Sequence, residues 1–212
     1  IKIGHIVDAS GVEATTGLNM KRSLELAFEA INMRIGDRPV EIITEDAADD
    51  PNQALARAKK LVEQDKVVAI FGPNAAGQKF AVNDYIKNAG HIPLILFSPC
   101  PDPLLGSENP WLVAAMGTNS QQPSVMADYV YNDLGYRKVN TLGQEGAGGK
   151  GFLMPFIGTF SALGGTVATQ VWPPAGTSDF GPFLTTLEDA DALVAWMPGD
   201  GIGMFIQYVK MG

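Results

Sequence analysis

Four apolar runs of this chain are each followed at once by a loop of glycine, proline and other small residues. The runs and their loops are residues 3–7 with 8–11, 67–71 with 72–77, 94–97 with 98–102, and 192–196 with 197–201. In an open parallel sheet the carboxyl ends of the strands gather at one edge, where backbone N–H groups and helix N-termini face a crevice. The pattern therefore predicts a parallel α/β sheet with a binding site built from loops.

Strand-like and helical runs alternate along the whole chain. The predicted strands are 1–7, 40–44, 67–71, 93–97, 111–115, 138–142, 166–172 and 192–196. The predicted helices are 18–33, 51–64, 76–87, 121–134, 149–163, 178–187 and 200–210. Asp50 followed by Pro51 matches a helix N-cap with proline at the first helical position. A break at residues 116–120 separates two doubly wound halves, so we expect an α/β fold with domains 1–117 and 118–212.

Composition limits the classes of partner. Of 212 residues, 46% are hydrophobic and 18% are charged, which is enough for one large core or two smaller ones. The net charge is −8 and no basic run occurs, so nucleic acid or polyphosphate would meet mostly repulsion. No apolar stretch approaches the roughly 20 residues that cross a bilayer. Ile1 opens a strand-like run without an initiator Met, so we expect a processed or trimmed end, which fits a removed export signal.

One segment matches a dinucleotide-binding fingerprint. Residues 146–151 read G-A-G-G-K-G, which satisfies G-x-G-x-x-G between a predicted strand and a predicted helix. The next strand ends in Thr169-Gln-Val-Trp172, without the acidic residue that holds a ribose hydroxyl, and the loop lies in the middle of the chain. We therefore favour a tight, ligand-facing loop over a nucleotide site and predict no cofactor.

No residues form a coherent catalytic or metal-binding set. Asp46, Asp49 and Asp50 resemble a cluster that holds Mg²⁺ or accepts a phosphoryl group, but no strand-end lysine fits such a site, and capping of the helix at Pro51 and a solvated acidic turn explain them better. Cys100 is the only cysteine, which excludes an intramolecular disulfide, and neither His5 nor His91 can be tied to it as an activating base. We interpret Cys100 as a small pocket-lining group. Ser10 and Ser98 lack a nucleophile elbow, so we predict no catalytic residue and no metal ligand.

A family resemblance rests on motifs spread along the chain in a fixed order. They are residues 1–4, 10–11, 27–32, 49–54, 69–73, 92–93, 98–99, 135–139, 148–151, 164–165 and 174–180, among them DDPNQA, AIFGP and PAGTSDF. Together they resemble the type I periplasmic binding proteins, the branched-chain amino-acid-binding group of ABC-import receptors. The resemblance covers essentially all of the chain.

The resemblance implies a fold, an activity and a set of contacts. The fold is two Rossmann-like lobes with parallel sheets, and a small ligand is trapped between them when a hinge closes. The activity is that of a non-enzymatic periplasmic or extracellular receptor that docks on an ABC permease when loaded. Carried over by motif position, the ligand contacts are Thr16, Asn74, Ala75, Ala76, Gly77, Cys100, Pro101, Asp102, Gly146, Ala147, Gly148, Met197, Pro198, Gly199 and Asp200.

This chain departs from the family pattern at the expected contacts. Amino-acid binders usually place hydroxyl residues in the loops after the third and fourth strands, and an aromatic residue before the G-x-G step. Here Ala75 and Ala76, then Asp102, then Gly148 occupy those places. An exposed carboxylate at Asp102 is expected to repel a carboxylate ligand and to favour a cationic or hydrogen-bond-donating one, unless the ligand contacts backbone N–H groups instead. Small amides, polar aromatics and amine-bearing compounds stay open.

The extent of the chain and the function of the fold both leave alternatives open. Family members continue beyond residue 212, so either this sequence is part of a longer chain, or exposed sheet edges would favour self-association. The same fold also serves ligand-sensing regulators such as amide sensors and receptor ectodomains. A third alternative, from a different functional class, is a nucleotide-dependent α/β enzyme.

Overall fold

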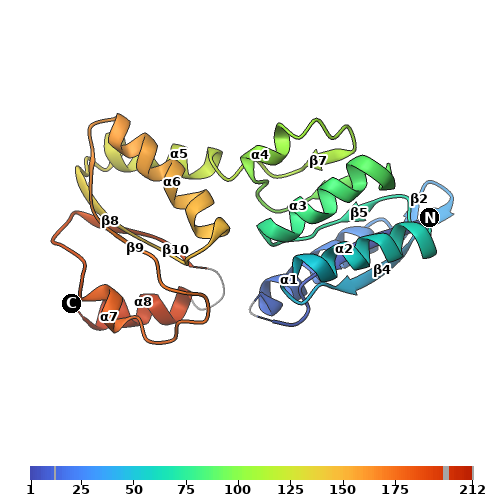
Figure 1. Ribbon diagram of the computed structural model, residues 1–212, viewed down its shortest axis with the longest axis horizontal. Coiled ribbons are helices and arrows are strands. Elements are labelled where there is room, and N and C mark those ends of the chain that lie inside the picture. The colour runs from blue at the N-terminus through green and yellow to red at the C-terminus, as the bar shows by residue number, and fades with distance from the viewer. Residues whose placement is uncertain (12, 198–200, 212) are drawn as a thin grey trace. The chain divides into compact units, whose positions relative to one another are not determined.

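Each of the two units into which the chain divides, Ile1–Gly117 and Thr118–Gly212, is built on a parallel sheet (Figure 1). The computed structural model describes residues 1–11, 13–197 and 201–211. Parallel strands covered by helices agree with the α/β fold class predicted from the alternating runs.

The sheet of the first unit has the order β4-β1-β5-β6-β7, and all of its strand pairs are parallel. Its strands are β1 (Lys2–Val7), β4 (Glu41–Asp46), β5 (Ile70–Phe71), β6 (Leu94–Leu96) and β7 (Leu112–Ala114). The chain passes from β1 to β4 on one side and then crosses to β5 on the other. The order therefore reverses at β1, and such a switch point opens a crevice at the carboxyl ends of the strands.

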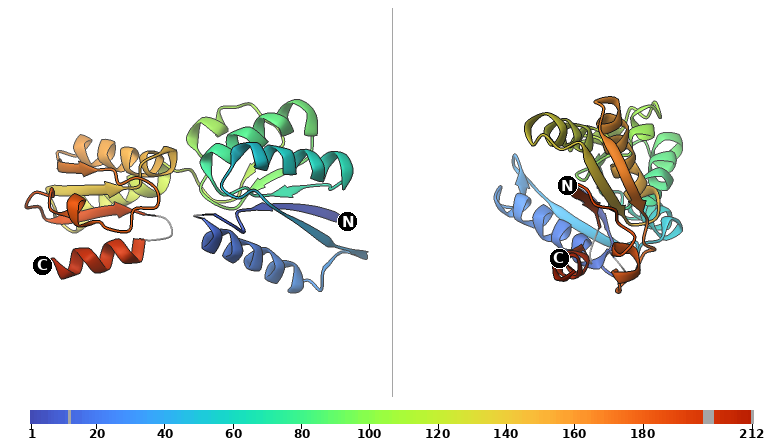
Figure 2. Two further views of the ribbon diagram at one scale, coloured as in Figure 1. Left: turned by 60° about the horizontal axis from the view of Figure 1, so that its bottom comes forward. Right: turned by 90° about the vertical axis from the view of Figure 1, so that its left-hand side faces the viewer.

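Helices cover both faces of this sheet (Figure 2). On one face lie α2 (Pro51–Lys59) with its continuation η1 (Lys60–Gln64), and α3 (Ala76–Tyr85) with its continuation η2 (Ile86–Gly90); α1 (Ala14–Glu29) lies on the other. Asp50 caps α2 as predicted, because its Oδ1 accepts hydrogen bonds from the N–H groups of Asn52 (2.6 Å) and Gln53 (3.1 Å).

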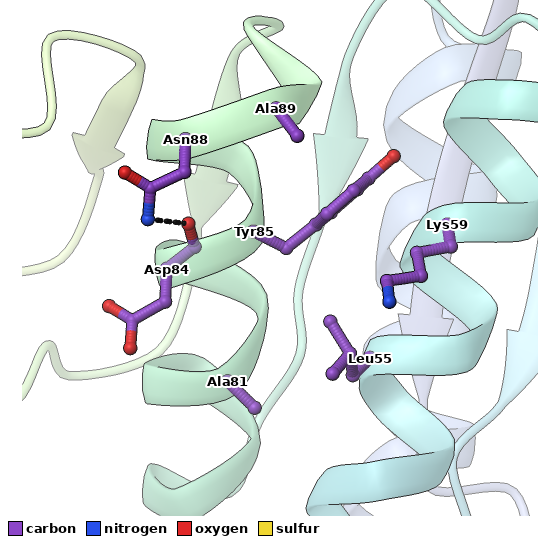
Figure 3. A pocket seen from close by; sticks show the side chains of 7 residues that line it. All are labelled: Leu55, Lys59, Ala81, Asp84, Tyr85, Asn88 and Ala89. Carbon is purple, nitrogen blue, oxygen red and sulfur yellow. Dashed lines mark hydrogen bonds between the residues drawn. The ribbon is translucent and has the colours of Figure 1, made fainter.

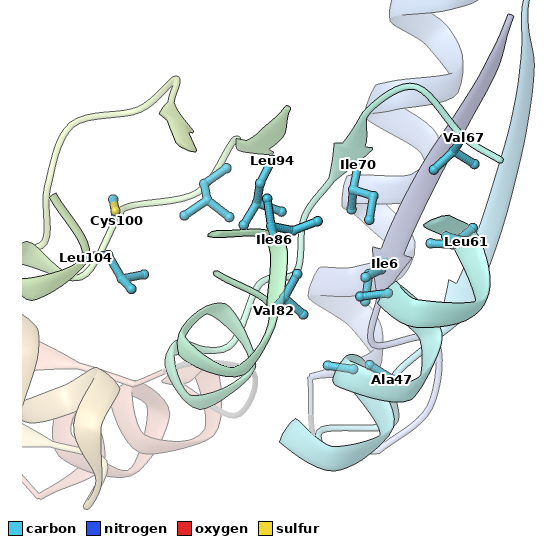
Figure 4. Packing of buried hydrophobic residues seen from close by; sticks show 13 residues of the cluster. Ile6, Ala47, Leu61, Val67, Ile70, Val82, Ile86, Leu94, Cys100 and Leu104 are labelled. Carbon is cyan, nitrogen blue, oxygen red and sulfur yellow. The ribbon is translucent and has the colours of Figure 1, made fainter. Parts of the chain in front are cut away.

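The core of the first unit lies between the sheet and the α2–α3 layer (Figure 4). Ile6, Leu61, Ile70, Ile86 and Leu94 are completely buried there. Alternate residues of a strand point to opposite faces, so Ile6 faces this core while His5 faces α1.

In the second unit, β8 (Lys138–Gly143) lies between β10 (Ala192–Trp196) and β9 (Thr166–Val171), all parallel. The helices are α5 (Gln121–Asp128), η3 (Tyr129–Asp133), α6 (Ala147–Ala162), α7 (Gly181–Leu184) and α8 (Gly201–Lys210). One hydrophobic cluster contains Phe156 and Phe160 of α6, and a second contains Leu184 of α7 and Met204 of α8.

Two predicted helices differ from those of the structure, and a hairpin and a short helix were missed. The helix predicted over 178–187 is only Gly181–Leu184, because Thr186 and Leu187 donate to carbonyl groups three residues back, which ends the α-helical pattern. The helix predicted over 18–33 lies at Ala14–Glu29, and Asn32 and Met33 adopt positive φ after it. The hairpin of β2 (Arg34–Ile35) and β3 (Arg38–Pro39) and the short α4 (Asp102–Leu105) were not predicted.

Among the described residues, no helix combines the length and the apolar character needed to cross a membrane.

Candidate functional site

The loop after β5 carries four of the predicted contacts of the first unit. Asn74 and Ala75 lie in the loop, and Ala76 and Gly77 are the first residues of α3. The turn is tight, because a Cβ atom on Gly72, whose φ is +83°, would lie 2.2 Å from the carbonyl oxygen of Ile6. Ala75 provides no side-chain cap, so the N-terminus of α3 has no side-chain acceptor from its own N-cap residue.

The loop after β6 carries three more predicted contacts. Cys100 and Pro101 are buried, whereas Asp102 is exposed and begins α4. The backbone N–H of Cys100 donates to the carbonyl of Gly117 at 3.1 Å, which fixes the loop. Burial raises the pKa of the Cys100 thiol, so this sulfur is not an activated nucleophile.

Thr16 lies in the first turn of α1, and close packing connects this turn to the edge of the sheet. Gly17 follows it, and a Cβ atom there would lie 2.1 Å from the carbonyl oxygen of Asp8. The Asp8 carboxylate in turn accepts a hydrogen bond at Oδ1 from Nε2 of Gln78 on α3 (2.7 Å). The first unit thus brings Thr16 and the start of α3 to the same edge of its sheet.

Asp8 is a buried acid at this edge. Its Oδ1 also accepts the N–H of Asp49 (2.8 Å), while its Oδ2 has no partner among the described residues. Burial is the largest influence on the carboxyl group and raises its pKa, although the bonds from Gln78 and Asp49 act in the opposite direction.

Lys79 is a buried base on α3. The side chain is 4% exposed, and its Nζ donates to the carbonyl of Pro99 in the loop after β6 (2.7 Å). No described carboxylate forms an ion pair with it. Burial lowers the pKa of Lys79 to about 8, which leaves the ammonium mostly charged at neutral pH.

The second unit brings its predicted contacts to the carboxyl ends of β8 and β10. Gly146 precedes α6, and Ala147 and Gly148 begin it, while Met197 follows β10. The N–H of Gln144 donates to the carbonyl of Trp196 (3.1 Å), which joins the two strand ends. The predicted contacts Pro198, Gly199 and Asp200 lie outside the described residues.

Close packing accounts for Gly148 and Gly149 of the fingerprint-like segment, whereas Gly146, which has no neighbour within 4 Å of a Cβ position, is favoured by its φ of +130°. A Cβ atom on Gly148 would lie 2.8 Å from the Trp196 ring, and one on Gly149 would lie 2.0 Å from the carbonyl oxygen of Gln144. These glycines let the start of α6 approach β8 and β10 closely. Nothing in this loop requires a phosphate group to explain its sequence.

A metal centre has no support in the described parts of the chain, where no three His, Cys, Asp or Glu residues are grouped to hold an ion.

A groove of about 380 Å³ lies between α2 and α3 with η2 (Figure 3). It is lined by Leu55, Lys59, Ala81, Asp84, Tyr85, Asn88 and Ala89. Lys59 Nζ lies 5.9 Å from the centre of the Tyr85 ring, and the Tyr85 hydroxyl donates to Glu63 at 3.0 Å. None of the predicted ligand contacts lines this groove, so we do not assign the ligand to it.

Three polar residues at the edge of the first sheet were not predicted as site residues: Asp8, Lys79 and Ser98. Ser98 is 8% exposed, and its hydroxyl has no partner among the described residues. A signal for Lys79 was present, because it shares a helical face with the buried residues Val82 and Ile86, where a lysine is unusual.

Comparisons with known proteins agree on one family. The family model described as "Periplasmic binding protein" matches residues 1–210. The chain is 27% identical to Leu/Ile/Val-binding protein homolog 6 of Brucella suis over 217 aligned residues, covering 100% of this chain and 55% of that protein. The chain thus spans about half the length of this curated relative.

Two solved structures are similar over 100% of this chain. The substrate-binding protein LivJ of Streptococcus pneumoniae in complex with isoleucine has a TM-score of 0.90 and 26% identity, with 61% of its chain covered. A solute-binding protein of Rhodopseudomonas palustris in complex with 3,4-dihydroxy benzoic acid has a TM-score of 0.89 and 26% identity, with 58% of its chain covered.

Proposed function

Because the chain belongs to the periplasmic binding protein family, we propose that it captures a small solute as an extracytoplasmic receptor and delivers it to an ABC permease. The family match over residues 1–210 is the observation that carries this proposal. The parallel sheets of both units support it, since each places its predicted contacts at the carboxyl ends of strands.

The proposed ligand is small and polar, and is either amino-acid-like or aromatic. LivJ was solved with isoleucine, and the Rhodopseudomonas protein with a dihydroxylated benzoic acid, so both known ligands carry a carboxyl group. In our proposal the ligand contacts the predicted loops. A ligand that binds one conformation of the protein better than another shifts the population toward the bound conformation.

Isothermal titration calorimetry tests the receptor function directly. The panel contains leucine, isoleucine, valine, benzoate, 4-hydroxybenzoate and 3,4-dihydroxybenzoate, each acid paired with its carboxamide, together with ATP and NAD. A receptor gives saturable binding of at least one small compound, which mass spectrometry recovers unchanged. Binding of a nucleotide alone, or conversion of the bound compound, would contradict the proposal.

A matched pair of variants tests where the ligand binds. Asn74→Ala removes a predicted contact and is expected to weaken binding about fivefold to tenfold, as loss of one hydrogen bond does. Asn88→Ala alters the groove between α2 and η2, where no contact is predicted, and is expected to leave affinity unchanged. Weaker binding by Asn88→Ala together with unchanged binding by Asn74→Ala would show that the ligand binds in the groove.

A further inference from the structure

The ammonium group of Lys79 is buried without a counter-ion in the described structure. Moving a charged amine out of water is costly, and buried lysines normally pair with a carboxylate. Here Nζ carries three N–H donors, and one of them bonds to the carbonyl of Pro99. Among the described residues, no carboxylate neutralises the positive charge of this group.

Ser98 adds a second donor in the loop that Lys79 contacts. It lies two residues beyond β6 and precedes Pro99, whose carbonyl accepts the hydrogen bond from Lys79 Nζ. Ser98 is 8% exposed, and its hydroxyl has no partner among the described residues. A buried hydroxyl and a buried ammonium therefore belong to the same short stretch of structure after β6.

The N-terminus of α3 adds a third feature that favours negative charge. The helix runs for ten residues, and its N-cap residue Ala75 has no side chain that can accept from the first N–H groups. The first N–H groups of a helix attract anions through their orientation and partial charge. Ala75 and Ala76 carry small side chains and are half-buried, and Gly77 beside them is exposed.

Among the described residues, the Cys100 thiol in the loop after β6 is the titratable group that interacts electrostatically with Lys79. Asp102, which begins α4, acts on Cys100, and Asp8, which follows β1, bonds to Gln78, the neighbour of Lys79 on α3. The thiol is neutral because burial raises its pKa. Asp102 is exposed, so water screens its charge more strongly than that of the buried ammonium.

We propose that Lys79, assisted by the Ser98 hydroxyl and the N-terminus of α3, is the specificity-determining residue that makes this receptor select ligands with an anionic group. This inference rests on the proposed receptor function and reverses the expectation, drawn from Asp102, that a carboxylate ligand is repelled. Ligand binding then depends on the charge of Lys79, so affinity for anions declines as the pH rises through about 8.

The test compares each acid of the panel that binds with its uncharged carboxamide. At about pH 6.5 the acid is expected to bind at least about tenfold more tightly than the amide, and at about pH 9.5 this preference is expected to fall to about a tenth of that value. Benzoate and benzamide form the cleanest pair, because neither changes its charge across this range. Equal affinity of acid and amide at low pH would overturn the inference and leave the receptor function standing, whereas no binding by any compound would contradict the receptor function itself.

Two variants separate the charge of Lys79 from its hydrogen bond. Lys79→Gln retains a donor for the carbonyl of Pro99, whereas Lys79→Met does not. If the charge selects the ligand, both variants lose the preference for the acid and still bind the amide. A preference that survives in Lys79→Gln would show that Lys79 only positions the loop.

Lys87 provides the matched control. It lies on η2 and also donates to a backbone carbonyl, that of Ser107, but it is far along the helix from the uncapped N-terminus. Lys87→Gln is expected to change neither the preference for the acid nor its pH dependence. An equal loss in Lys87→Gln and Lys79→Gln would overturn the assignment to Lys79.

Nuclear magnetic resonance of the lysine side chains gives a readout independent of affinity. Without ligand, the Lys79 signal is expected to titrate near pH 8. Saturation with benzoate is expected to raise that pKa by about one pH unit, because tenfold tighter binding to the charged form is a tenfold change in its acid constant. An unchanged titration on saturation with a bound acid would contradict the inference.

Discussion

Gln78 Nε2 donates to Asp8 Oδ1 at 2.7 Å, and this bond joins the first turn of α3 to the residue that follows β1. Both side chains are completely buried, and each retains one oxygen without a partner among the described residues. The contact crosses the switch point of the first sheet, where the strand order reverses. It therefore fixes the loops on either side of the proposed ligand-binding edge.

Replacement of Asp8 tests the importance of that bond. Asp8→Ala removes the acceptor of the Asp49 N–H and of Gln78, and is expected to lower the free energy of unfolding by about 1 to 3 kcal/mol. Asp8→Asn keeps one carbonyl oxygen. Burial raises the pKa of Asp8, so the folded state favours the neutral carboxyl group. The contribution of Asp8 to the free energy of unfolding therefore declines as the pH rises above the pKa of an ordinary carboxyl group.

Urea denaturation at a series of pH values that starts near the ordinary carboxyl value of about 4 and rises to about 8 measures this difference. Asp8→Asn is expected to gain stability relative to the native protein as the pH rises through this series, while Asp8→Ala stays less stable than both. A constant difference between Asp8→Asn and the native protein would show that Asp8 does not titrate in this range.

His5 is expected to make the first unit sensitive to acid. It is completely buried, with both ring nitrogens unpaired among the described residues, and burial lowers its pKa to about 4. An unfolded histidine protonates near pH 6.5, so the unfolded state binds the proton first and stability falls as the pH drops from about 6.5 to about 4. The full loss is about 3 kcal/mol.

Comparison of His5→Phe with His91→Asn isolates this effect. Phenylalanine retains the ring contact with Phe97 and cannot titrate, so chemical denaturation is expected to show a smaller decline toward low pH. His91 is exposed and has a φ of +52°, which asparagine tolerates, so His91→Asn is expected to keep the native pH dependence. Equal pH dependence in both variants would locate the acid sensitivity elsewhere.

Two glycines of α6 are expected to respond oppositely to alanine. At Gly149 a Cβ atom would lie 2.0 Å from the carbonyl oxygen of Gln144, so Gly149→Ala is expected to cost about 2 kcal/mol or more. At Gly158 no atom lies within 4 Å, so Gly158→Ala is expected to stabilise the helix by about 0.5 to 1 kcal/mol. Thermal unfolding of both variants measures the contrast, and equal shifts would contradict the packing explanation of the fingerprint-like segment.

The sequence was sufficient where local chemistry decides the structure. The cap at Asp50 and the runs that form β1, β8 and β10 are set by neighbouring residues, and the structure confirms them. The helix predicted over 178–187 was wrong at its start because Gln207 of α8 holds that segment: its Nε2 donates to the Ser178 carbonyl, and its Oε1 accepts from the Phe180 N–H. That partner is distant in sequence and gives no local signal.

The residues of the candidate site also divide into those that local sequence indicates and those that depend on tertiary contacts. Loop positions such as Asn74 and Gly146 follow from strand ends and motifs, so they could be named from the sequence, and their contact with a ligand stays a prediction. Lys79 was missed because its importance depends on burial beneath the loop after β6. A lysine in an otherwise apolar helix face is visible in the sequence, but its lack of a carboxylate partner is a tertiary property.

The buried charge of Lys79 is expected to reduce stability in exchange for ligand selection. Its pKa is about 8 in the folded protein against 10.5 for an ordinary lysine, so the unfolded state binds the proton more strongly between these values and stability rises with pH across that window. At neutral pH Lys79→Met is expected to gain about 2 kcal/mol, after allowance for the lost bond to Pro99. Denaturation of the ligand-free protein at about pH 7 and about pH 10 measures the gain, which is expected to shrink at the higher pH as the native lysine becomes neutral. A variant less stable than the native protein at both values would mean that the bond to Pro99 outweighs the cost of the buried charge, and that Lys79 is retained for stability.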